Sequence, residues 1–519
     1  MKKFLLSACS ALCFLAASAQ APEDILRYSY FPQHGSARNM AIGGAMGSLG
    51  GDINALFVNP AGLGLYKTRE IVFSPGFGFN NNKANYRSTN TSATKSGFDL
   101  GTTGIVIGYH NPYSKWTSQA FSFGINQTAN FNNVISYQGS NSNSSFAEQY
   151  AEEISSNHIN LTGNLTDPRY AYGSYPAIYT YLVDTALNAD RTISVKSLPE
   201  KFLLEKGLAI KQEKTAITKG GIYELALGYA ANMDDKFYVG GSLGIPIVNY
   251  QRITTFKESD PSGNPNNNFD NFVYKDTLST KGFGVNAKLG VIYKPVEFVR
   301  LGLSVQTPTY YSLTDKETSA ITTNSEKYLS NNPTRFASSR LFTGGTEGST
   351  RYTATTPWKL VMSASYVFRE INDTRKQRAF ITADIEYIGY AGSNFRADGQ
   401  TITTEDQQYY KDLKSIINQQ YKGAFNYRLG GELKFNTFMF RLGGAYYSNP
   451  YQDAQLKSNI VQGSGGIGYR NHGIFIDLTY VHNLTKDVNF PYRLTDKPNT
   501  YAVQQNTRGN VIMTVGFKL

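Results

Sequence analysis

The stretch FYVGGSLGIPI, residues 237–247, alternates large apolar side chains with small or polar ones. Successive side chains of an extended strand point to opposite faces, so this stretch has one apolar face and one polar face. A strand that crosses a bilayer needs about 9–11 residues and turns its apolar face to lipid. The pattern therefore predicts a membrane-spanning β-strand. Its apolar face consists of Phe237, Val239, Leu243, Ile245 and Ile247, and the opposite face includes Tyr238, Gly240, Ser242 and Gly244.

The same alternation recurs along the chain and predicts fourteen strands in total. A bacterial single-chain barrel requires an even number of strands, and this count satisfies that requirement. The 37 Tyr, 31 Phe and 48 Gly residues suit such a barrel, although a soluble exported β-protein shares that composition. The predicted strands are 69–80, 97–111, 117–137, 219–232, 236–256, 278–295, 298–315, 352–368, 379–393, 423–436, 437–449, 456–470, 472–485 and 505–519.

The lengths of the connections separate a membrane barrel from a soluble sandwich. Membrane barrels of this kind have short periplasmic turns and long outer loops. Every link from an even-numbered to an odd-numbered predicted strand is short, whereas 138–218, 257–277, 316–351, 394–422 and 486–504 are long. The link near 450–456 is shorter than this rule requires. The sequence thus predicts an all-β, 14-stranded antiparallel transmembrane barrel over 69–519, with both termini periplasmic.

Charged residues within the predicted strands fall on the polar face. A Lys or Arg on the lipid face near the midplane would cost about 2–4 kcal/mol, so these residues are expected to line the lumen, where opposite signs can pair. The chain has a net charge of +11 but no long basic run. This argues against nucleic-acid binding and favours contact with outer-membrane lipid and lipopolysaccharide. The residues are Glu224, Lys288, Arg300, Lys359, Asp384, Glu386, Arg428, Glu432, Lys434, Arg441 and Asp477.

The first nineteen residues predict an export signal. Lys2 and Lys3 precede a short apolar run, and Ala17-Ser18-Ala19 is a small-x-small cleavage site. A lipoprotein signal ending before Cys9 is the alternative, but the apolar run continues well past that residue. Because Cys9 and Cys13 are the only cysteines, the mature chain has no disulfide, thiolate metal site or cysteine nucleophile.

Residues 20–68 precede the first predicted strand and do not alternate. Short helices are expected near 37–46 and 52–58, with Asp52 capping the second helix and Asn59-Pro60 ending it. Such an apolar, glycine-rich segment is expected to fold into the barrel lumen and obstruct the pore.

This segment resembles the N-terminal hatch of the FadL/TodX family of outer-membrane transporters. The resemblance rests on Gly35-Ser36-Ala37-Arg38, Gly43-Gly44-Ala45, Asp52, and the run ALFVNPAGL at 55–63. It implies a monomeric Gram-negative outer-membrane barrel for passive uptake of fatty acids or aromatic hydrocarbons. The implied gate is Asn59, Pro60 and Ala61, with Phe57 and Leu63 beside them. The alternating final strand, ending at Leu519, resembles the signal read by the barrel-insertion machinery.

The resemblance also implies where ligand would travel. The 138–218 connection would form an outer groove, unless its apolar faces only pack on each other. The polar run 126–130 in the third predicted strand is either a kink that opens sideways or a part beyond the membrane. A fatty-acid carboxylate would require a lumenal cation, unless each cation already pairs with a lumenal acid. The candidates are Arg300, Lys359, Arg428 and Arg441.

No catalytic or metal motif is expected to act in this chain. Gly240-Gly241-Ser242-Leu243-Gly244 matches the hydrolase elbow, but Ser242 lies within a strand rather than at a strand-to-helix turn. The five histidines are scattered. His34, at the edge of the hatch, is the one candidate for a haem ligand, and a polar residue in contact with solvent is the simpler explanation. We therefore expect no enzyme, cofactor or metal. The alternative function is an accessory or shuttle barrel of a protein-secretion system.

Overall fold

The computed structural model describes residues 21–161, 163, 165–187, 191–329, 332–368, 378–399, 402–453 and 456–519. The predicted signal peptide, residues 1–19, lies outside this range. Within the described residues, no helix is both long enough and apolar enough to cross a bilayer.

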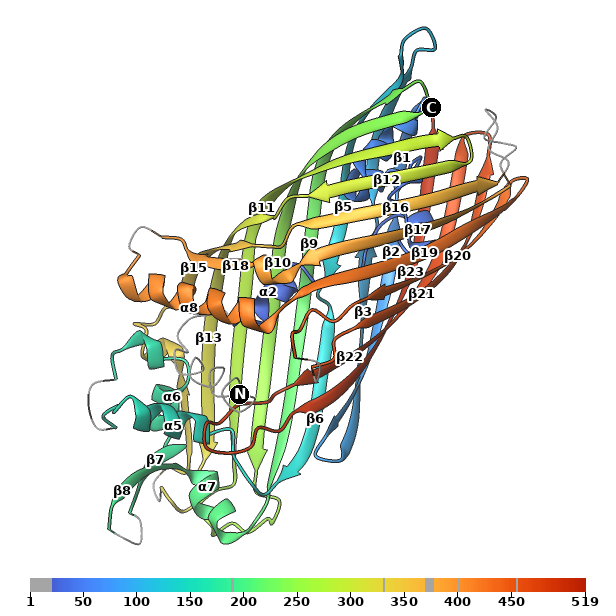
Figure 1. Cartoon of the computed structure of the whole chain (residues 1–519). Helices are drawn as coiled ribbons and strands as arrows, with labels where there is room; N and C mark the ends of the chain where they lie inside the picture. Colours follow the sequence, from blue (N-terminus) through green and yellow to red (C-terminus); the bar gives the residue numbers. More distant parts are fainter. Residues whose placement is uncertain are drawn as a thin grey trace.

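One antiparallel sheet of 21 strand segments closes on itself and forms the wall of a tall barrel (Figure 1). The closure is made by β23 (Ala502–Lys518), which pairs with both β1 (Arg69–Phe73) and β2 (Pro75–Tyr86). Several segments are consecutive pieces of one strand, so the wall has fourteen strands, as predicted.

The pieces of the wall follow in chain order. After β1–β2 come β3 (Thr89–Leu100) with β4 (Thr103–His110), β5 (Trp116–Asn130) with β6 (Asn133–Asn141), β9 (Ile210–Met233), β10 (Phe237–Ser259), β11 (Asn271–Val296), and β12 (Val299–Gln306) with β13 (Tyr310–Asn324). Then come β14 (Thr334–Ser338), β15 (Gly348–Thr355) and β16 (Lys359–Phe368), β17 (Ala379–Gly389) with β18 (Asn394–Ala397), β19 (Gly423–Phe435), β20 (Phe438–Tyr447), β21 (Ile460–Asn471), β22 (Ile474–Asn489) and β23.

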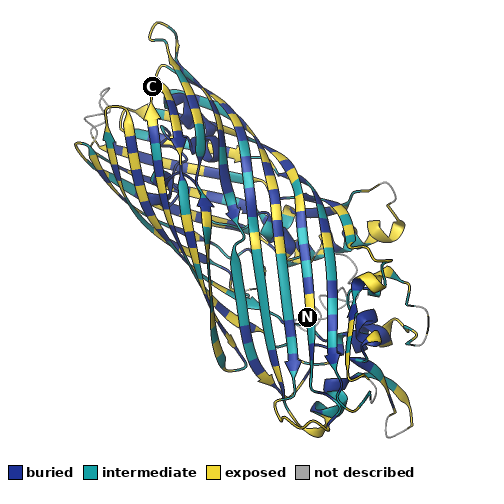
Figure 2. Cartoon of the chain, turned by 180° about the vertical axis from the view of Figure 1, so that it is seen from behind, coloured by how far each residue is buried: buried dark blue, intermediate teal, exposed yellow. Residues whose placement is uncertain are grey.

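The two faces of the wall differ as the alternation predicted. Exposed and buried residues alternate along the strands in Figure 2. On β10 and β11 the outward side chains are apolar, with Leu243 66% and Leu289 69% exposed, whereas the inward Lys288 is 2% exposed. None of the strand charges predicted to face the lumen is exposed. The outer surface is therefore apolar where lipid would lie, and the charges are inside.

The strands extend further than the lipid-facing alternation indicated. β9, β10 and β11 have 24, 23 and 26 residues, well beyond the length needed to cross a bilayer. Their outer halves expose polar side chains, among them Lys211, Lys219, Gln251 and Lys275. The strands remain paired there although they have no apolar face, so the apolar alternation did not predict these outer halves. The connections are correspondingly shorter: 142–209 instead of 138–218, and 260–270 instead of 257–277.

The predicted short turns are confirmed at 111–115, 234–236, 297–298, 436–437 and 472–473. Most of the sixth link, 369–377, lies outside the described residues. All five turns lie at the end of the barrel that contains the C-terminus in Figure 1, and the long connections lie at the other end. We call these the short-turn end and the long-connection end.

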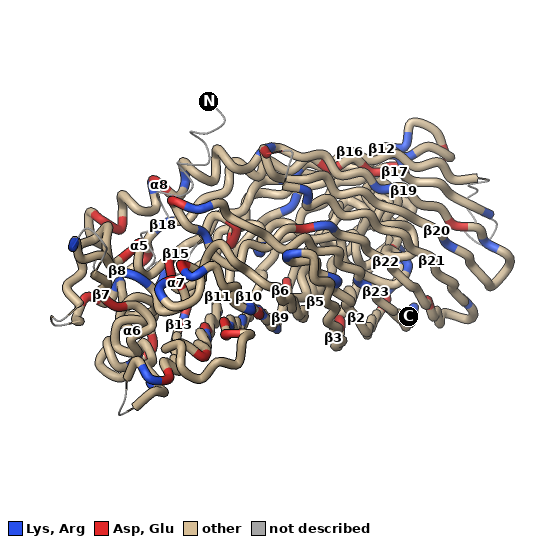
Figure 3. The backbone as a smooth tube through the Cα atoms, turned by 90° about the horizontal axis from the view of Figure 1, so that it is seen from below, with Lys and Arg blue, Asp and Glu red and all other residues tan. Residues whose placement is uncertain are grey.

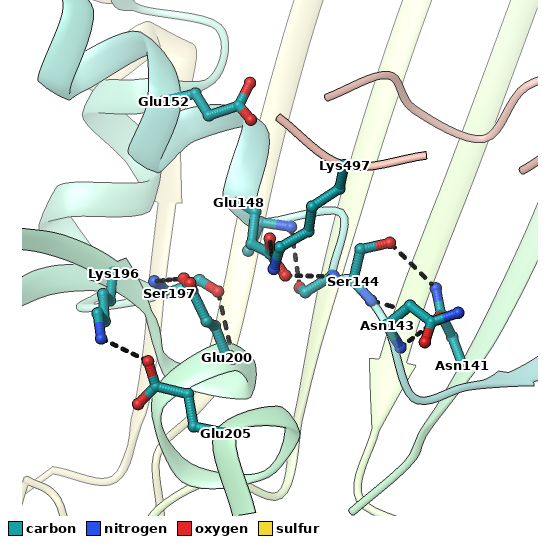
Figure 4. A network of polar contacts seen from close by, with 12 residues as sticks. Asn141, Asn143, Ser144, Glu148, Glu152, Lys196, Ser197, Glu200, Glu205 and Lys497 are labelled. Carbon is teal, nitrogen blue, oxygen red and sulfur yellow. Dashed lines mark hydrogen bonds and ion pairs between the residues drawn. The ribbon is translucent and has the colours of Figure 1, made fainter. Parts of the chain in front are cut away.

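The longest connection folds into a compact cap at the long-connection end. It contains α5 (Glu148–Ser156), η3 (Pro168–Tyr170), α6 (Ser174–Tyr179), β7 (Val183–Leu187), β8 (Ile193–Ser197), α7 (Leu198–Phe202) and η4 (Leu204–Lys206). Its apolar side chains, among them Ile178, Leu182 and Leu203, pack with one another and against the barrel rim at Phe256 and Phe272. Self-packing, one of the two readings of these apolar faces, is thus observed. A polar network ties the cap to the 490–501 connection, for example Lys497 to Glu148 at 2.5 Å (Figure 4).

The first described residues also lie at the long-connection end. Helix α2 (Asp24–Arg27) packs in an apolar cluster with α8 (Thr404–Gln420). The hydroxyl of Tyr421 donates to the carbonyl of Pro22 at 3.2 Å, whereas the Lys518 amide bonds to Gly473 in a short turn. The described chain therefore begins and ends at opposite ends of the barrel. Ile25 and Leu26 are buried at this place. The side of the membrane that each terminus faces stays a prediction.

Candidate functional site

The candidate site is centred on residues 33–66, which cross the interior of the barrel. The segment contains α3 (Ala37–Ala41), α4 (Ala55–Val58) and the 3-10 helix η2 (Pro60–Leu65). Helix α3 contacts β20, β21, β22 and β23, whereas η2 contacts β5, β9, β10 and β11 on the opposite side of the ring. Both expected helices form, but each is shorter than predicted. Asn54 rather than Asp52 occupies the N-cap position of the second and makes no side-chain cap bond, whereas the Asp52 carboxylate accepts the Asn54 N–H at 2.8 Å.

Inward-facing serines and threonines satisfy the irregular backbone of this segment. A buried carbonyl left without a donor costs about 1–3 kcal/mol, so these contacts matter for its stability. Ser242, in the sequence that matched the hydrolase elbow, donates to the Leu56 carbonyl at 3.0 Å. Its hydroxyl therefore anchors the segment. The other donors are Ser118 to Gly64, Ser304 to Val58, Ser464 to Ala41 and Thr479 to Ala37, at 2.7–3.1 Å.

Asn59 ties the segment both to itself and to the barrel wall. Its amide nitrogen donates to the Gly47 carbonyl at 2.6 Å and to the Val291 carbonyl at 3.3 Å. Its amide oxygen accepts the Ala61 N–H at 3.1 Å. A Cβ at position 290 of β11 would overlap that oxygen, so Gly290 leaves room for Asn59. Asn59 is extended, with φ −141° and ψ 100°, and ends α4 as predicted.

The other predicted gate residues surround Asn59 but face different neighbours. Pro60 begins η2 and lies so close to β10 that a Cβ at Gly240 would come within 2.6 Å of its backbone. Ala61 packs with Tyr238 and Ile292. Phe57 and Leu63 belong to one apolar cluster with residues of β4, β5 and β9. The structure thus brings all five residues to one side of the lumen.

A small polar cavity lies between the segment and the long-connection end. Its volume is about 60 Å³, enough for a few water molecules. Phe57 and His34 line it from the segment, Phe31 lines it from just before the segment, and the barrel contributes mainly charged and amide side chains. Two ion pairs lie in its wall, Lys288–Glu224 at 2.5 Å and Arg428–Glu386 at 2.6 Å. The cavity is lined mainly by polar groups and is too small for a large ligand.

The four lumenal cations predicted to hold a carboxylate differ in their partners. Arg428 pairs with Glu386, and Arg441 pairs with Glu432 at 2.6 Å and Asp477 at 2.5 Å. Arg300 donates to the Leu49 carbonyl at 2.8 Å. Lys359 lines the cavity with its ammonium 5.4 Å from the Phe31 ring, and it makes no ion pair with any described residue. Pairing with acids was the alternative for each cation, and it holds for Arg428 and Arg441.

Known structures share this architecture. No family model and no curated protein sequence matches the chain. A Pseudomonas aeruginosa FadL homologue matches at TM-score 0.51 and 12% identity, over 93% of this chain and 98% of that one. The P. putida toluene transporter TodX matches at TM-score 0.50 and 13% identity, over 94% and 99%. The chain has the FadL-type fold. At 12% and 13% sequence identity, the similarity shows a shared fold alone.

The third strand of this FadL-type barrel is irregular, as one of the two sequence interpretations proposed. Its ladder with β9 shifts register between Gln127 and Ala129, which marks a bulge, and the strand breaks between β5 and β6. No ladder joins β3 to β6 among the described residues. Side chains bridge this seam instead: Asn130 donates to the Phe98 carbonyl at 3.3 Å and Thr91 to the Ser136 carbonyl at 2.7 Å.

The N-terminal segment lies directly behind the seam. Its contacts there include Asp99 and Asn510, which the sequence analysis did not single out, and His34 and Asn126, which it named for other reasons. His34 lies 3.4 Å from the Asp99 carboxylate of β3, and its carbonyl accepts from Asn126 of β5 at 3.1 Å. Asn510 of β23 also donates to Asp99, at 2.7 Å. These partners are far apart in the sequence and follow no motif, so pattern reasoning could not find them. Among the described residues, no group of His, Asp, Glu or Cys side chains could hold a metal ion.

Proposed function

We propose that this FadL-type barrel is an outer-membrane channel for passive uptake of hydrophobic small molecules, with residues 20–68 as its hatch. One observation carries the proposal: the buried segment 33–66 crosses the lumen of a barrel whose outer surface is apolar. The solved structures that resemble this chain include a protein described as a toluene transporter. In this proposal the barrel is a monomer in the Gram-negative outer membrane, among lipid and lipopolysaccharide, placed there by the barrel-insertion machinery.

Ligand contact is proposed at the cavity beside the hatch. Lys359 is the candidate for a fatty-acid carboxylate, because it lines the cavity and makes no direct ion pair among the described residues, whereas the nearby Glu224 and Glu386 are paired with Lys288 and Arg428. Arg300, Arg428 and Arg441 remain weaker candidates, since their guanidinium groups already bind backbone or acids. Phe31 and Phe57 supply apolar surface beside Lys359. Entry of a ligand requires residues near Phe31 to move, because the closed cavity is small.

The proposed gate is Asn59-Pro60-Ala61 with Phe57 and Leu63. Asn59 joins the segment to the backbone of β11, so loss of its hydrogen bonds would loosen the contact between segment and wall. The proposed exit is the seam between β3 and β6, since side chains alone join the strands there. His34 and Asn126 would couple movement of the segment to that seam.

Uptake by whole cells tests this function. Cells that lack the gene would be complemented with the wild-type chain, and uptake of labelled oleate and labelled toluene would be measured. We expect Lys359→Gln to reduce oleate uptake about tenfold while toluene uptake changes little, since only oleate carries a carboxylate. Lys275→Gln, on the exposed face of β11, is the matched control.

The proposal fails if deletion of the gene changes the uptake of neither compound. A secretion defect in the deletion strain, with secretion proteins co-purifying with the barrel, would favour the accessory role instead. No contact among the described residues currently favours that role. We also propose that the chain is not an enzyme, because Ser242 binds the Leu56 carbonyl and has no base at hydrogen-bond distance among the described residues.

A further inference from the structure

A second, larger cavity opens at the short-turn end, on the far side of the N-terminal segment from the polar cavity. We call it the vestibule; its lining includes Gly50, Leu65 and Lys67 of the segment and Arg470, Phe475 and Lys518 of the wall. Its volume is about 870 Å³. Sites for small molecules commonly have about 300–1,000 Å³, so the vestibule has the size of a ligand site.

The charge of the vestibule is strongly unbalanced. Seven lysines and arginines line it, against three acidic side chains. Asp235 lies 3.6 Å from Lys67, one of the seven, and Glu432 lies 2.6 Å from Arg441, which is outside the lining, so cations remain in excess. Basic residues also recur in the turns at this end of the barrel (Figure 3). The vestibule therefore presents excess positive charge to whatever enters it.

Arg470 is the cation best placed to receive an anion. It makes no ion pair with any described residue, and its Nε is buried without a hydrogen-bond partner there. Its guanidinium carbon lies 5.3 Å from the Phe475 ring centroid, which restrains the group at the wall. Lys518, which lies 3.6 Å from Glu70, is close enough for its charge to interact with that of Arg470. A guanidinium with free donors beside a second cation suits carboxylate and phosphate oxygens.

We propose that the vestibule binds a small organic anion that carries carboxylate or phosphate groups, with Arg470 as the main contact. Phe475, Phe380 and Leu65 would contact the apolar part of the molecule. This site goes beyond the proposed uptake of hydrophobic compounds, because seven cations make its lining a poor path for a hydrocarbon. The segment that would act as the hatch separates it from the cavity at Lys359.

Calorimetric titration of the purified full-length barrel in neutral detergent tests the site. Citrate and pyrophosphate are the probes, one for each oxyanion chemistry, and glucose is the uncharged control. We expect one or both anions to bind saturably, with affinity falling at least tenfold in Arg470→Gln and partly recovering in Arg470→Lys. Lys236→Gln, in a turn outside the vestibule lining, should bind within about twofold of the wild type.

The proposal is overturned if neither anion binds saturably, or if Arg470→Gln binds as the wild type does. Should Arg470→Gln fail to fold, hydrogen exchange of the wild-type barrel decides: the anion should protect amides at 470–475 and 518–519. Protection at the long-connection end instead would overturn the site. Anion binding and hydrophobic uptake are measured separately, so either proposal can fail alone.

Discussion

The N-terminal segment lies very close to the barrel wall at positions where one or both residues are glycine. Gly290 faces the amide of Asn59, and Gly443 and Gly444 face Gly43, whose φ is +70°. At Gly43 the nearest backbone oxygen of Gly444 would lie 2.6 Å from a Cβ. Glycine is needed at these contacts because two backbones meet where any side chain would separate them.

Replacing Gly290 by alanine should therefore loosen the segment. Its Cβ would displace the Asn59 amide and break the bonds to Gly47 and Val291, with an expected cost of about 1–3 kcal/mol, typical of overpacking. Faster hydrogen exchange of amides at 47–66 would show this. Gly463→Ala on β21 is the control, since nothing lies within 4 Å of its Cβ position. Equal exchange in both variants would contradict the role of Asn59 as an anchor.

Among the elements, the cap and the 490–501 connection meet through titratable groups. Glu152 of α5 accepts the Thr495 N–H at 3.1 Å. Burial, together with a hydrogen bond to Asp496, raises the pKa of Glu152 from 4.5 to about 7. A raised pKa means that the closed contact binds a proton more tightly than the open one does. The contact is thus fully stabilised below about pH 4.5 and is weakened as the pH rises through 7.

Spin labels at the exposed residues Ser155 and Pro498 would measure this contact. We expect the distance distribution between them to broaden and shift to longer distances between pH 5.5 and pH 8. Glu152→Gln should abolish the change, since a neutral amide does not titrate and can still accept from Thr495. A pH response that persists in Glu152→Gln would assign the effect to another group.

The seam between β3 and β6 gives a second prediction at this scale. Thr91 and Ser136 face each other across it, and the predicted mature chain has no cysteine. A cysteine pair at these positions, joined by a disulfide or a short bifunctional reagent, should hold the seam closed. If ligand leaves through the seam, cross-linking should lower oleate uptake several-fold, and reduction should restore it. Unchanged uptake with complete cross-linking would exclude this exit.

At the scale of the whole molecule, the barrel wall and the segment are separable parts. Fourteen strands enclose an interior that residues 33–66 cross from one side to the other. Removal of this segment should leave an open pore, because the wall closes through its own ladder between β23 and β1–β2. We expect large, stable single-channel currents in planar bilayers from the deletion variant and small ones from the intact chain.

Folding of the deletion variant must be checked by its heat-dependent migration on detergent gels. A folded variant that conducts no better than the intact chain would show that other elements close the pore. Helix α8 and the cap are the remaining candidates, because both lie at the long-connection end. Removing 404–420 as well would then distinguish between them.

The membrane-spanning part of the barrel wall could be predicted from the amino-acid sequence. Apolar and polar side chains alternate with a period of two along one strand, as in 237–247, and this pattern is visible in the sequence. The alternation is maintained because a charge on the lipid-facing side costs free energy. The parity of short and long links followed from the same constraint. The sequence also predicted the short helices near Ala37 and Ala55, and the end of the second at Asn59-Pro60. Local backbone chemistry determines these features.

The contacts between side chains inside the barrel could not be predicted from the sequence. The ion pairs of Arg428 and Arg441 and the contact between His34 and Asp99 join residues from distant parts of the chain. The same holds for the absence of such a pair at Lys359 among the described residues. The buried start of the chain at the long-connection end and the missing ladder at the seam were equally invisible. The physical reason is that alternation records which face a residue takes, whereas pairing depends on register and distance around a closed ring.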